Sequence, residues 1–206
     1  RLVMRLSVLP GVPRDEQRAH AADRKKNGPS LLRYTKMPVR HWDHWRQPTR
    51  LHLVVIDGDT RTDLTPDADG ELFESAWDVR AGKVVITAAL PAADRLDDTA
   101  LWIFDLATGA RTTIPARPGV NLSDPKLSPD GRLVAASRSA RLPGEHGPVR
   151  VAILDLDGSE RILADDWDRW PSPVGWRDGE VVVSVREDGT TSLFSIHSQT
   201  LSLIHI

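Results

Sequence analysis

The residues best suited to chemistry in this chain are two histidines with a carboxylate between them, in the run His41-Trp42-Asp43-His44. If the run were helical, its two histidines could ligate a metal such as zinc. A closed site needs a third and a fourth ligand, and no other histidine or carboxylate follows at a recognisable spacing. We therefore predict no metal site here, and we expect an amphipathic anchor in which Trp42 and Trp45 pack.

No residue qualifies as a hydrolytic nucleophile by its sequence surroundings. The chain contains no G-x-S-x-G elbow and no glycine-rich phosphate loop. The serines of the central part occur in turn and strand contexts, where serine is a common turn former or filler: Ser123, Ser128, Ser137 and Ser139. The sequence therefore predicts no catalytic residue, no cofactor and no cofactor-binding residue, and it identifies no substrate-binding residue.

Two acidic motifs have alternative interpretations. Asp155 and Asp157 could be drawn as a general acid–base pair, but aspartates recur at equivalent turns, namely Asp57, Asp59 and Asp105. Repetition at each turn indicates turn residues. The run 165–170, DDWDRW, could be an aromatic and acidic recognition patch. We expect instead an outer crossover whose tryptophans seal the gap between two neighbouring sheets.

The stretch 121–165 predicts the type of structure that positions these residues. Ser128-Pro129-Asp130-Gly131 indicates a tight turn, because proline presets φ, aspartate caps the turn and glycine accepts a positive φ. Around it lie a short apolar run ending at 126–127, three further runs and one longer loop: 132–137, 149–156, 159–164 and the loop 140–148. Four strands joined mainly by short turns predict one antiparallel meander.

The same unit recurs on both sides of this meander. The glycines of the first turn, spaced by 49 and 48 residues, are Gly82, Gly131 and Gly179. The glycines after the third strand, spaced by 51 and 49 residues, are Gly58, Gly109 and Gly158. A period near 50 residues with four strands per unit is typical of β-propeller blades. The predicted fold class is therefore all-β, a partial β-propeller of four-stranded antiparallel blades.

A helical insertion is predicted near the N-terminus of this propeller. Leu2–Leu9 fits the second strand of a first, incomplete blade, and residues 51–56 and 60–64 fit its third and fourth strands. The insertion between them, residues 10–50, contains a predicted surface helix at Arg14–Asn27, with acidic residues near its start and basic residues near its end. Apolar residues of 31–45 are expected to pack on the propeller surface.

The remaining blades follow in order along residues 1–200. The second blade is predicted over 73–115, with strands near 73–78, 83–89, 100–106 and 110–115. The fourth begins near Ser172 and has a hairpin turn at Glu187-Asp188-Gly189. About three and a half blades cannot close a ring, so we expect exposed strand edges and marginal stability for this chain alone.

The composition and the chain ends of the sequence indicate which partners, which compartment and which chain boundaries to expect. The net charge of −2 gives no electrostatic reason to expect nucleic acid or a membrane surface as partner. The lack of cysteine is compatible with a reducing, cytoplasmic compartment. The last six residues, 201–206, look like the translation of a transposon end sequence used in preparing sequencing libraries. We therefore expect a non-native tail and a natural chain cut near Thr200.

Four segments carry a resemblance to a known family: Gly11–Glu16 with the basic helix after it, Val39–Trp45, Leu51–Val55 and Ser123–Gly131. Together they resemble the N-terminal propeller of prolyl oligopeptidase family serine peptidases, in particular bacterial acylaminoacyl-peptidase and dipeptidyl-aminopeptidase-like members. The S-P-D-G turn is shared with other bacterial propellers, such as the periplasmic component of the Tol system. The R-H-W-D-x-W stretch is more specific, and the resemblance extends to about residue 198.

The resemblance implies that this chain is part of a longer protein in which another domain carries the catalytic residues. In this family the propeller is paired with a C-terminal α/β-hydrolase domain, where a serine attacks the peptide carbonyl, a histidine is the base and an aspartate orients the histidine. The propeller covers that active site and admits short peptides. This chain lacks the hydrolase domain, so the resemblance implies only the gating part of the function. The alternative is a non-enzymatic Tol-type or WD-like propeller for protein–protein interaction.

Overall fold

A computed structural model of the chain describes residues 1–29, 31, 33–34, 40–41, 44–45, 47–72, 75–90, 98–142, 145–197 and 203–205. Among these, only the backbone is described at 40–41, 44, 141–142, 145–146 and 203–205. The chain divides into two compact units, Arg1–Phe73 (unit 1) and Glu74–Ile206 (unit 2). The sheets of both units are antiparallel, which confirms the predicted all-β class.

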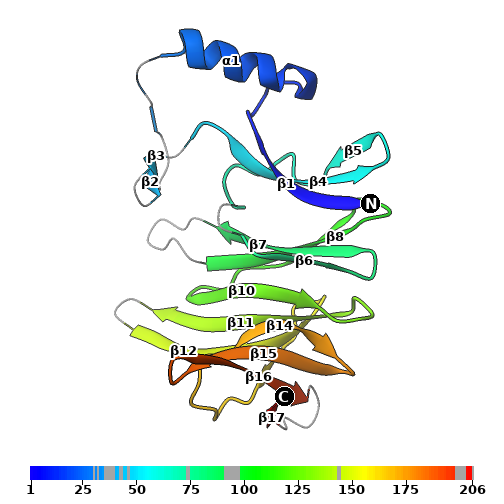
Figure 1. Cartoon of the computed structure of the whole chain (residues 1–206), viewed down its shortest axis with the longest axis vertical. Coiled ribbons are helices and arrows are strands. Elements are labelled where there is room, and N and C mark those ends of the chain that lie inside the picture. Colours follow the sequence, from blue (N-terminus) through cyan, green and yellow to red (C-terminus); the bar gives the residue numbers. More distant parts are fainter. Residues whose placement is uncertain are drawn as a thin grey trace. The chain divides into compact units, whose positions relative to one another are not determined.

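The described residues of unit 2 form three four-stranded sheets in which strands adjacent along the chain are adjacent in the sheet (Figure 1). Blade 2 contains β6 (Trp77–Arg80), β7 (Lys83–Leu90), β8 (Asp98–Asp105) and β9 (Arg111–Ile114). Blade 3 contains β10 (Val120–Leu127), β11 (Leu133–Leu142), β12 (Glu145–Asp155) and β13 (Glu160–Leu163). Blade 4 contains β14 (Ser172–Arg177), β15 (Glu180–Glu187), β16 (Thr190–His197) and β17 (Leu203–His205).

The turn between β10 and β11 has the structure that its sequence predicts. The Gly131 amide donates to the Ser128 carbonyl at 2.9 Å, and the Ser128 hydroxyl oxygen accepts from the Leu133 amide at 2.9 Å. Gly131 has a φ of +68°, and the corresponding Gly82 and Gly179 have φ of +70° and +81°. Residues with a Cβ are strained in this region, so the repeated glycines report one repeated turn.

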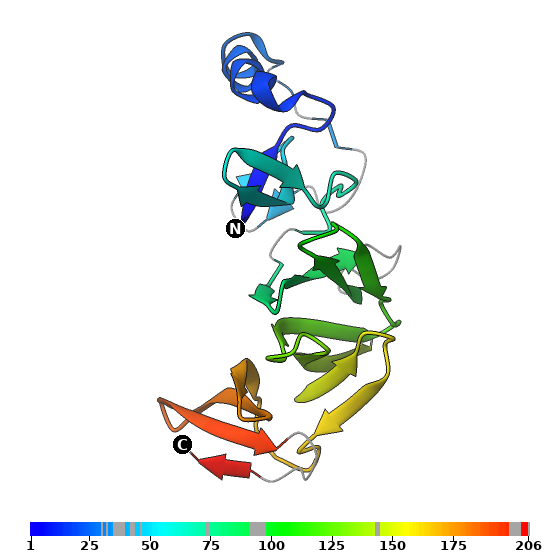
Figure 2. The same cartoon turned by 90° about the vertical axis from the view of Figure 1, so that its right-hand side faces the viewer.

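The three blades of unit 2 pack face to face as successive layers (Figure 2). One core joins Val85, Leu101 and Ile103 of blade 2 to Val134, Ala136, Ala152 and Leu154 of blade 3. A second joins Ala135, Val151 and Ile153 of blade 3 to Val181, Val183 and Val185 of blade 4. Successive side chains of a strand point to opposite faces. Blade 3 therefore has a back face toward the preceding blade and a front face toward the following one.

Polar side chains tie the same layers together at their edges. Asp78 of blade 2 accepts from the Leu127 amide of blade 3 at 2.9 Å. The indole nitrogen of Trp176 in blade 4 donates to the Lys126 carbonyl of blade 3 at 3.0 Å. Each bond joins a side chain of one blade to a backbone group of β10, and each fixes one layer against its neighbour.

Unit 1 contains a related sheet of three strands, blade 1, with the order β1–β4–β5. The elements in the described residues of unit 1 are β1 (Leu2–Val8), η1 (Arg14–Glu16), α1 (Gln17–Asn27), β2 (Arg40–His41), β3 (His44–Trp45), β4 (Arg50–Asp57) and β5 (Thr60–Asp63). The antiparallel pairs β1–β4 and β4–β5 match the predicted second, third and fourth strands. The predicted helix is also confirmed, and it buries no residue.

The loop predicted at 140–148 is wrong. β11 continues to Leu142 and β12 begins at Glu145, so most of this segment extends the β11–β12 hairpin. The register shifts between Ser139 and Arg141, close to Pro148, which has no amide hydrogen to donate. A local irregularity of this kind lets a sheet continue past a proline and past residues that otherwise look like loop.

Some predicted packing of apolar residues is also wrong. Leu31 is 74% exposed, Trp45 is 55% exposed and Trp170 is 70% exposed, so these side chains cover little of the structure. Apolar character alone does not supply a partner. Trp167 packs on the core between blades 3 and 4, as predicted. Its ring meets that of Phe194 edge to face, with the ring centroids 5.0 Å apart. Trp42 lies outside the described residues.

The predicted non-native tail takes part in the sheet of blade 4. Leu203–His205 form β17, which pairs with β16 through Ile196, Ser195 and Phe194. This position is that of the fourth strand of the other blades. The origin of residues 201–206 stays a prediction.

Candidate functional site

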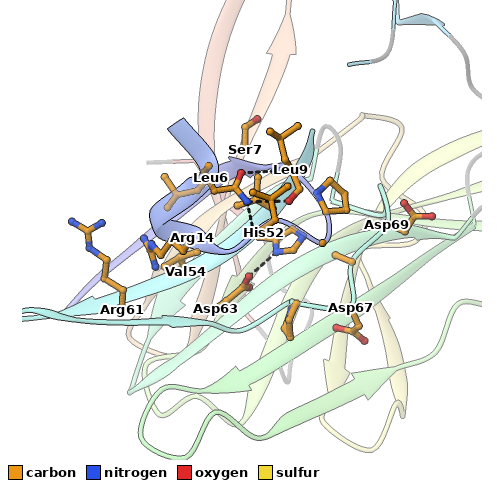
Figure 3. A pocket seen from close by; sticks show the side chains of 17 residues that line it. Leu6, Ser7, Leu9, Arg14, His52, Val54, Arg61, Asp63, Asp67 and Asp69 are labelled. Carbon is orange, nitrogen blue, oxygen red and sulfur yellow. Dashed lines mark hydrogen bonds and ion pairs between the residues drawn. The ribbon is translucent and has the colours of Figure 1, made fainter. Parts of the chain in front are cut away.

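The candidate site is a cavity of about 700 Å³ in unit 1 (Figure 3). Its wall comes from the end of β1, the chain segment after it, β4, β5 and the segment 66–69. Much of the lining is apolar, including Leu6, Leu9 and Val54. Charged groups stand among these side chains, namely Arg14, Arg61, Asp63, Asp67 and Asp69.

A histidine–aspartate pair lies among the polar residues that line this cavity. His52 Nδ1 lies 2.6 Å from Asp63 Oδ2, and His52 is only 6% exposed. The other carboxylate oxygen of Asp63 accepts from the Thr65 amide at 2.9 Å. The Thr65 hydroxyl oxygen in turn accepts from the Leu53 amide at 2.8 Å. An ionised Asp63 accepts a hydrogen bond from a proton on Nδ1, so a neutral His52 ring would accept at Nε2 and a charged ring would donate there.

Gln17 at the start of α1 holds the segment that follows β1. Its side-chain oxygen accepts from the Leu9 amide at 2.7 Å, and its nitrogen donates to the Leu9 and Val12 carbonyls at 2.9 and 2.8 Å. One amide side chain thus satisfies three backbone groups that no strand ladder covers. This bracket fixes the rim of the cavity relative to the helix.

The arrangement lacks a nucleophile for hydrolysis. Among the residues that line the cavity, Ser7 has the only hydroxyl side chain. Ser7 pairs with Leu51 while Leu6 pairs with His52, so Ser7 faces the opposite side of the sheet from the histidine. Figure 3 shows its hydroxyl pointing away from the His52 ring. The pair can therefore hold and orient a polar group, but nothing in the lining would let it activate a serine.

The metal-like run of the sequence is a hairpin rather than a helix. Arg40 pairs with Trp45 and His41 pairs with His44 in the strands β2 and β3. Trp42 and Asp43 lie outside the described residues. No group of three or more histidine, cysteine or acidic side chains that could hold a metal occurs in the described part of the chain.

The turn aspartates behave as turn residues. Asp105 Oδ1 accepts from the amides of Ala107 and Thr108, both at 2.9 Å, and the Thr108 amide in particular holds the pKa of Asp105 below its usual range. Asp157 accepts from the Ser159 amide at 2.8 Å, and this bond lowers the pKa of Asp157 in the same way. Both carboxylates are committed to backbone amides, as the sequence interpretation expected.

Sequence reasoning missed the His52–Asp63 pair. The two residues are 11 positions apart and belong to neighbouring strands, so their meeting depends on the register of β4 against β5. Val54 pairs with Asp63, which places His52 diagonally next to the carboxylate on the same face. The available signal was a histidine in an otherwise apolar strand followed by an aspartate at the end of the next strand.

Known proteins share parts of this sequence and of this fold. The sequence matches no protein-family model. Dipeptidyl-peptidase 5 of Schizosaccharomyces pombe is 23% identical over 193 residues, covering 82% of this chain and 27% of that protein. The acylaminoacyl peptidase of Pyrococcus horikoshii superposes with a TM-score of 0.59 at 12% identity, over 86% of this chain and 28% of that one. This chain is built of β-propeller blades.

A further solved structure, a protein assigned as TolB of Agrobacterium tumefaciens, superposes with a TM-score of 0.52 at 15% identity. It covers 76% of this chain and 56% of that one. The sequence match confirms the predicted resemblance to a peptidase family, and the structural matches show the fold. The chain spans about a quarter of the length of the curated relative. No helix in the described residues is long and apolar enough to cross a membrane.

Proposed function

We propose that this chain is the substrate-gating propeller portion of a serine peptidase that hydrolyses short peptides, of acylaminoacyl- or dipeptidyl-peptidase type. The observation that carries the proposal is the match to dipeptidyl-peptidase 5 over most of this chain. The similar fold of an acylaminoacyl peptidase supports it. The partners would be short peptides and an α/β-hydrolase domain elsewhere in the same polypeptide, and the location would be the cytoplasm.

A gating role requires that the propeller be rigid enough to act as a wall around the entrance. In unit 2 the cores between the blades consist of fully buried aliphatic side chains, such as Leu101, Ala152 and Val183. Such packing resists deformation because buried side chains interlock at high density. Polar bonds between layers, such as that from Trp176 to the Lys126 carbonyl, add fixed points at the edges. A rigid wall of this type would admit or refuse peptides by size.

The test uses the full-length gene product. It should hydrolyse chromogenic acyl-amino-acid or dipeptide anilides, and a fluorophosphonate that labels the active serine should abolish the reaction. A series of peptides of increasing length should show a steep fall in kcat/KM, because long chains would not pass the propeller. Labelling with equal rates for short peptides and casein would contradict gating while preserving the peptidase. Neither labelling nor hydrolysis would contradict both.

The second candidate is a non-enzymatic Tol-type or WD-like propeller that binds other proteins. The similarity to the TolB structure favours it, because that match includes more than half of the TolB chain. The sequence that the gene encodes beyond residue 200 distinguishes the two candidate functions. A G-x-S-x-G motif there, followed by aspartate and histidine, supports the peptidase, whereas further blades without such a motif support the binding propeller.

A further inference from the structure

A strained carboxylate lies where the first strands of the blades in unit 2 meet. β10, the first strand of blade 3, contacts both β6 and β14, the first strands of its neighbours. β10 contains a bulge, since its register against β11 shifts between Ser123 and Lys126. Asp124 stands in this bulge with a φ of +51°. Bulges re-aim side chains, and a strained residue inside a strand is a reason to look for a function there.

The position of Asp124 differs from that of other residues with this backbone conformation. The other non-glycine residues with positive φ among those that the structure describes lie outside the strands, namely Ala81, Ala164, Asp178 and Asp188. Asparagine accepts a positive φ as readily as aspartate does. The backbone conformation therefore does not by itself require a charged side chain at position 124.

The carboxylate of Asp124 has weak partners. The Ser123 hydroxyl donates to its Oδ2 at 3.3 Å, and the Ser172 hydroxyl of blade 4 donates to the same oxygen at 3.4 Å. Hydroxyl groups bound strongly to a carboxylate lie at about 2.5–2.7 Å. In the described part of the chain, Oδ1 accepts no hydrogen bond and no lysine or arginine pairs with this carboxylate. Asp124 is thus a half-buried anion whose charge is not neutralised.

Half-buried carboxylates elsewhere in the blades have stronger partners. Asp78 accepts from the Leu127 amide at 2.9 Å, and Asp63 lies 2.6 Å from His52. Glu160 meets two arginine side chains. The contrast indicates that the charge of Asp124 is available to a group from outside the chain.

An exposed aromatic residue precedes the same junction between blades 3 and 4. The chain is docked on blade 3 just before β14, because the Ser137 hydroxyl donates to the Pro171 carbonyl at 3.5 Å and Ser172 reaches Asp124. Trp170 comes directly before this docked segment, and it is 70% exposed instead of sealing the two blades. Aromatic rings and carboxylates are the two kinds of group that attract ammonium and guanidinium ions.

We propose that Asp124 and Trp170 bind the cationic group of a peptide, which is its N-terminal ammonium or a lysine or arginine side chain. Asp124 supplies the charge and the acceptor Oδ1, and Trp170 supplies the face of its ring. Val174, in the corresponding bulge of β14, is 47% exposed and offers the apolar part of the peptide a surface. That the ligand is a peptide rests on the proposed function, whereas the binding of a cation at Asp124 does not.

Calorimetric titration of the full-length protein with short peptide amides tests the proposal. A fluorophosphonate first blocks any active serine, so that no peptide is cleaved. The first peptide has a free N-terminus and contains norleucine, the second is acetylated and contains lysine, and the third is acetylated and contains norleucine. At least one cationic peptide should bind about tenfold more tightly than the neutral third peptide, as expected for hydrogen bonds to charged groups. The peptide that shows the gain identifies the source of the cation.

Variants assign the gain to the two residues. Asp124→Asn keeps the shape of the side chain and should reduce the affinity for the cationic peptides to that for the neutral one. The matched control Asp157→Asn removes the same charge from an exposed turn of blade 3 and should leave the gain unchanged. Trp170→Ala should reduce the gain about threefold, and Trp170→Phe should retain most of it.

Three results would overturn the proposal. They are equal affinity for all peptides, no binding of any peptide, and equal losses for Asp124→Asn and Asp157→Asn, which would reflect net charge. An unchanged gain in Trp170→Ala would remove Trp170 from the site. The site and the peptidase can be judged separately. Hydrolysis of anilides with equal affinities for all peptides contradicts the site alone, whereas a gain that depends on Asp124 in a protein without labelling or hydrolysis contradicts the peptidase alone.

Discussion

Blade 1 and blade 3 have the same strand pairing but different surroundings. In both, the second and third strands pair antiparallel, with Met4 opposite Val54 in blade 1 and Ala136 opposite Ala152 in blade 3. Blade 3 is covered on both faces by neighbouring sheets, whereas the back face of blade 1 contains a cavity of about 700 Å³. A blade's secondary structure is thus local, while the burial of its apolar residues depends on its neighbours.

The largest effect should come from Leu154→Ala, at the centre of the core between blades 2 and 3. Leu154 is 0% exposed, and truncation of a buried leucine costs about 2–5 kcal/mol of unfolding free energy. The equivalent Ile56 is half-buried, so Ile56→Ala should cost less than half as much in the 206-residue chain. Urea unfolding followed by circular dichroism measures both values.

The same pair of variants sharpens the comparison between the two blades when it is placed in the full-length protein. If another blade covers Ile56 there, the cost of Ile56→Ala should rise toward that of Leu154→Ala. Equal costs already in the 206-residue chain would show that the back face of blade 1 is as well packed as that of blade 3. In that case the comparison fails.

The second effect concerns charges between the blades of unit 2. Glu160 is 12% exposed at its side chain and meets two arginines, with Arg117 Nη1 at 2.8 Å and Arg138 Nε at 3.3 Å. Three buried polar atoms of this cluster lack a hydrogen bond, one from each residue. Glu160→Gln would leave two guanidinium groups facing each other without a carboxylate. We expect a loss of about 1–3 kcal/mol in unfolding free energy, since removing one partner strands the other charge.

Asp165→Asn supplies the matched control for this cluster. Its partner Arg150 is the residue equivalent to His52, but the Asp165 side chain is 79% exposed. An ion pair in contact with water contributes little, and we expect a change within about 0.5 kcal/mol. Thermal unfolding at low and high salt distinguishes the two sites. A loss for Asp165→Asn as large as that for Glu160→Gln would show that burial of the carboxylate does not decide the strength of these ion pairs.

The third effect separates two glycines with the same backbone conformation. Gly82 and Gly131 both have φ near +70°, so alanine at either should cost about 1–2 kcal/mol of unfolding free energy. A Cβ at Gly82 would meet nothing within 4 Å, whereas one at Gly131 would lie 3.0 Å from the Ala81 Cβ of blade 2. Gly131→Ala should therefore lower Tm more than Gly82→Ala. Equal shifts in Tm would mean that blades 2 and 3 can separate locally to admit a methyl group.

These glycines also show what could be predicted from the sequence. The turn at 128–131 needs a positive φ, so its glycine recurs with each blade, and residue types alone reveal the period and the strand order. The extension of β11 and β12 could not be predicted, because polar residues there gave no strand pattern. The His52–Asp63 pair depends on register between strands, which residue types did not specify. The exposure of Leu31 and Trp45 depends on which residues cover them, and the apolar character of a side chain does not specify those residues.

The smallest effect is a difference in how turn carboxylates respond to pH and salt. The pKa of Asp105 in unit 2 is held below its usual value of 3.8 chiefly by the Thr108 amide, and that of Asp57 in unit 1 chiefly by the Arg1 side chain at 2.7 Å. A carboxyl group with a lowered folded-state pKa adds stability above its unfolded pKa. That stability is lost as pH falls through the folded value. Tm should therefore be flat above about pH 5 and should fall below about pH 4.

Asn substitutions distinguish the amide hydrogen bonds that lower the pKa of Asp105 from the ion pair that lowers the pKa of Asp57. Asp105→Asn should reduce the acid-side fall in Tm by a similar amount at 20 mM and 1 M NaCl, because amide hydrogen bonds within one turn are short-range and fixed by the backbone. Asp57→Asn should reduce the fall at 20 mM NaCl and have little effect at 1 M, where the Debye length is about 3 Å and the exposed ion pair is screened. Identical salt dependence for both variants would mean that the turns of units 1 and 2 hold their carboxylates by the same force. Units 1 and 2 would then differ in the packing of their blades but not in how their turns hold a carboxylate.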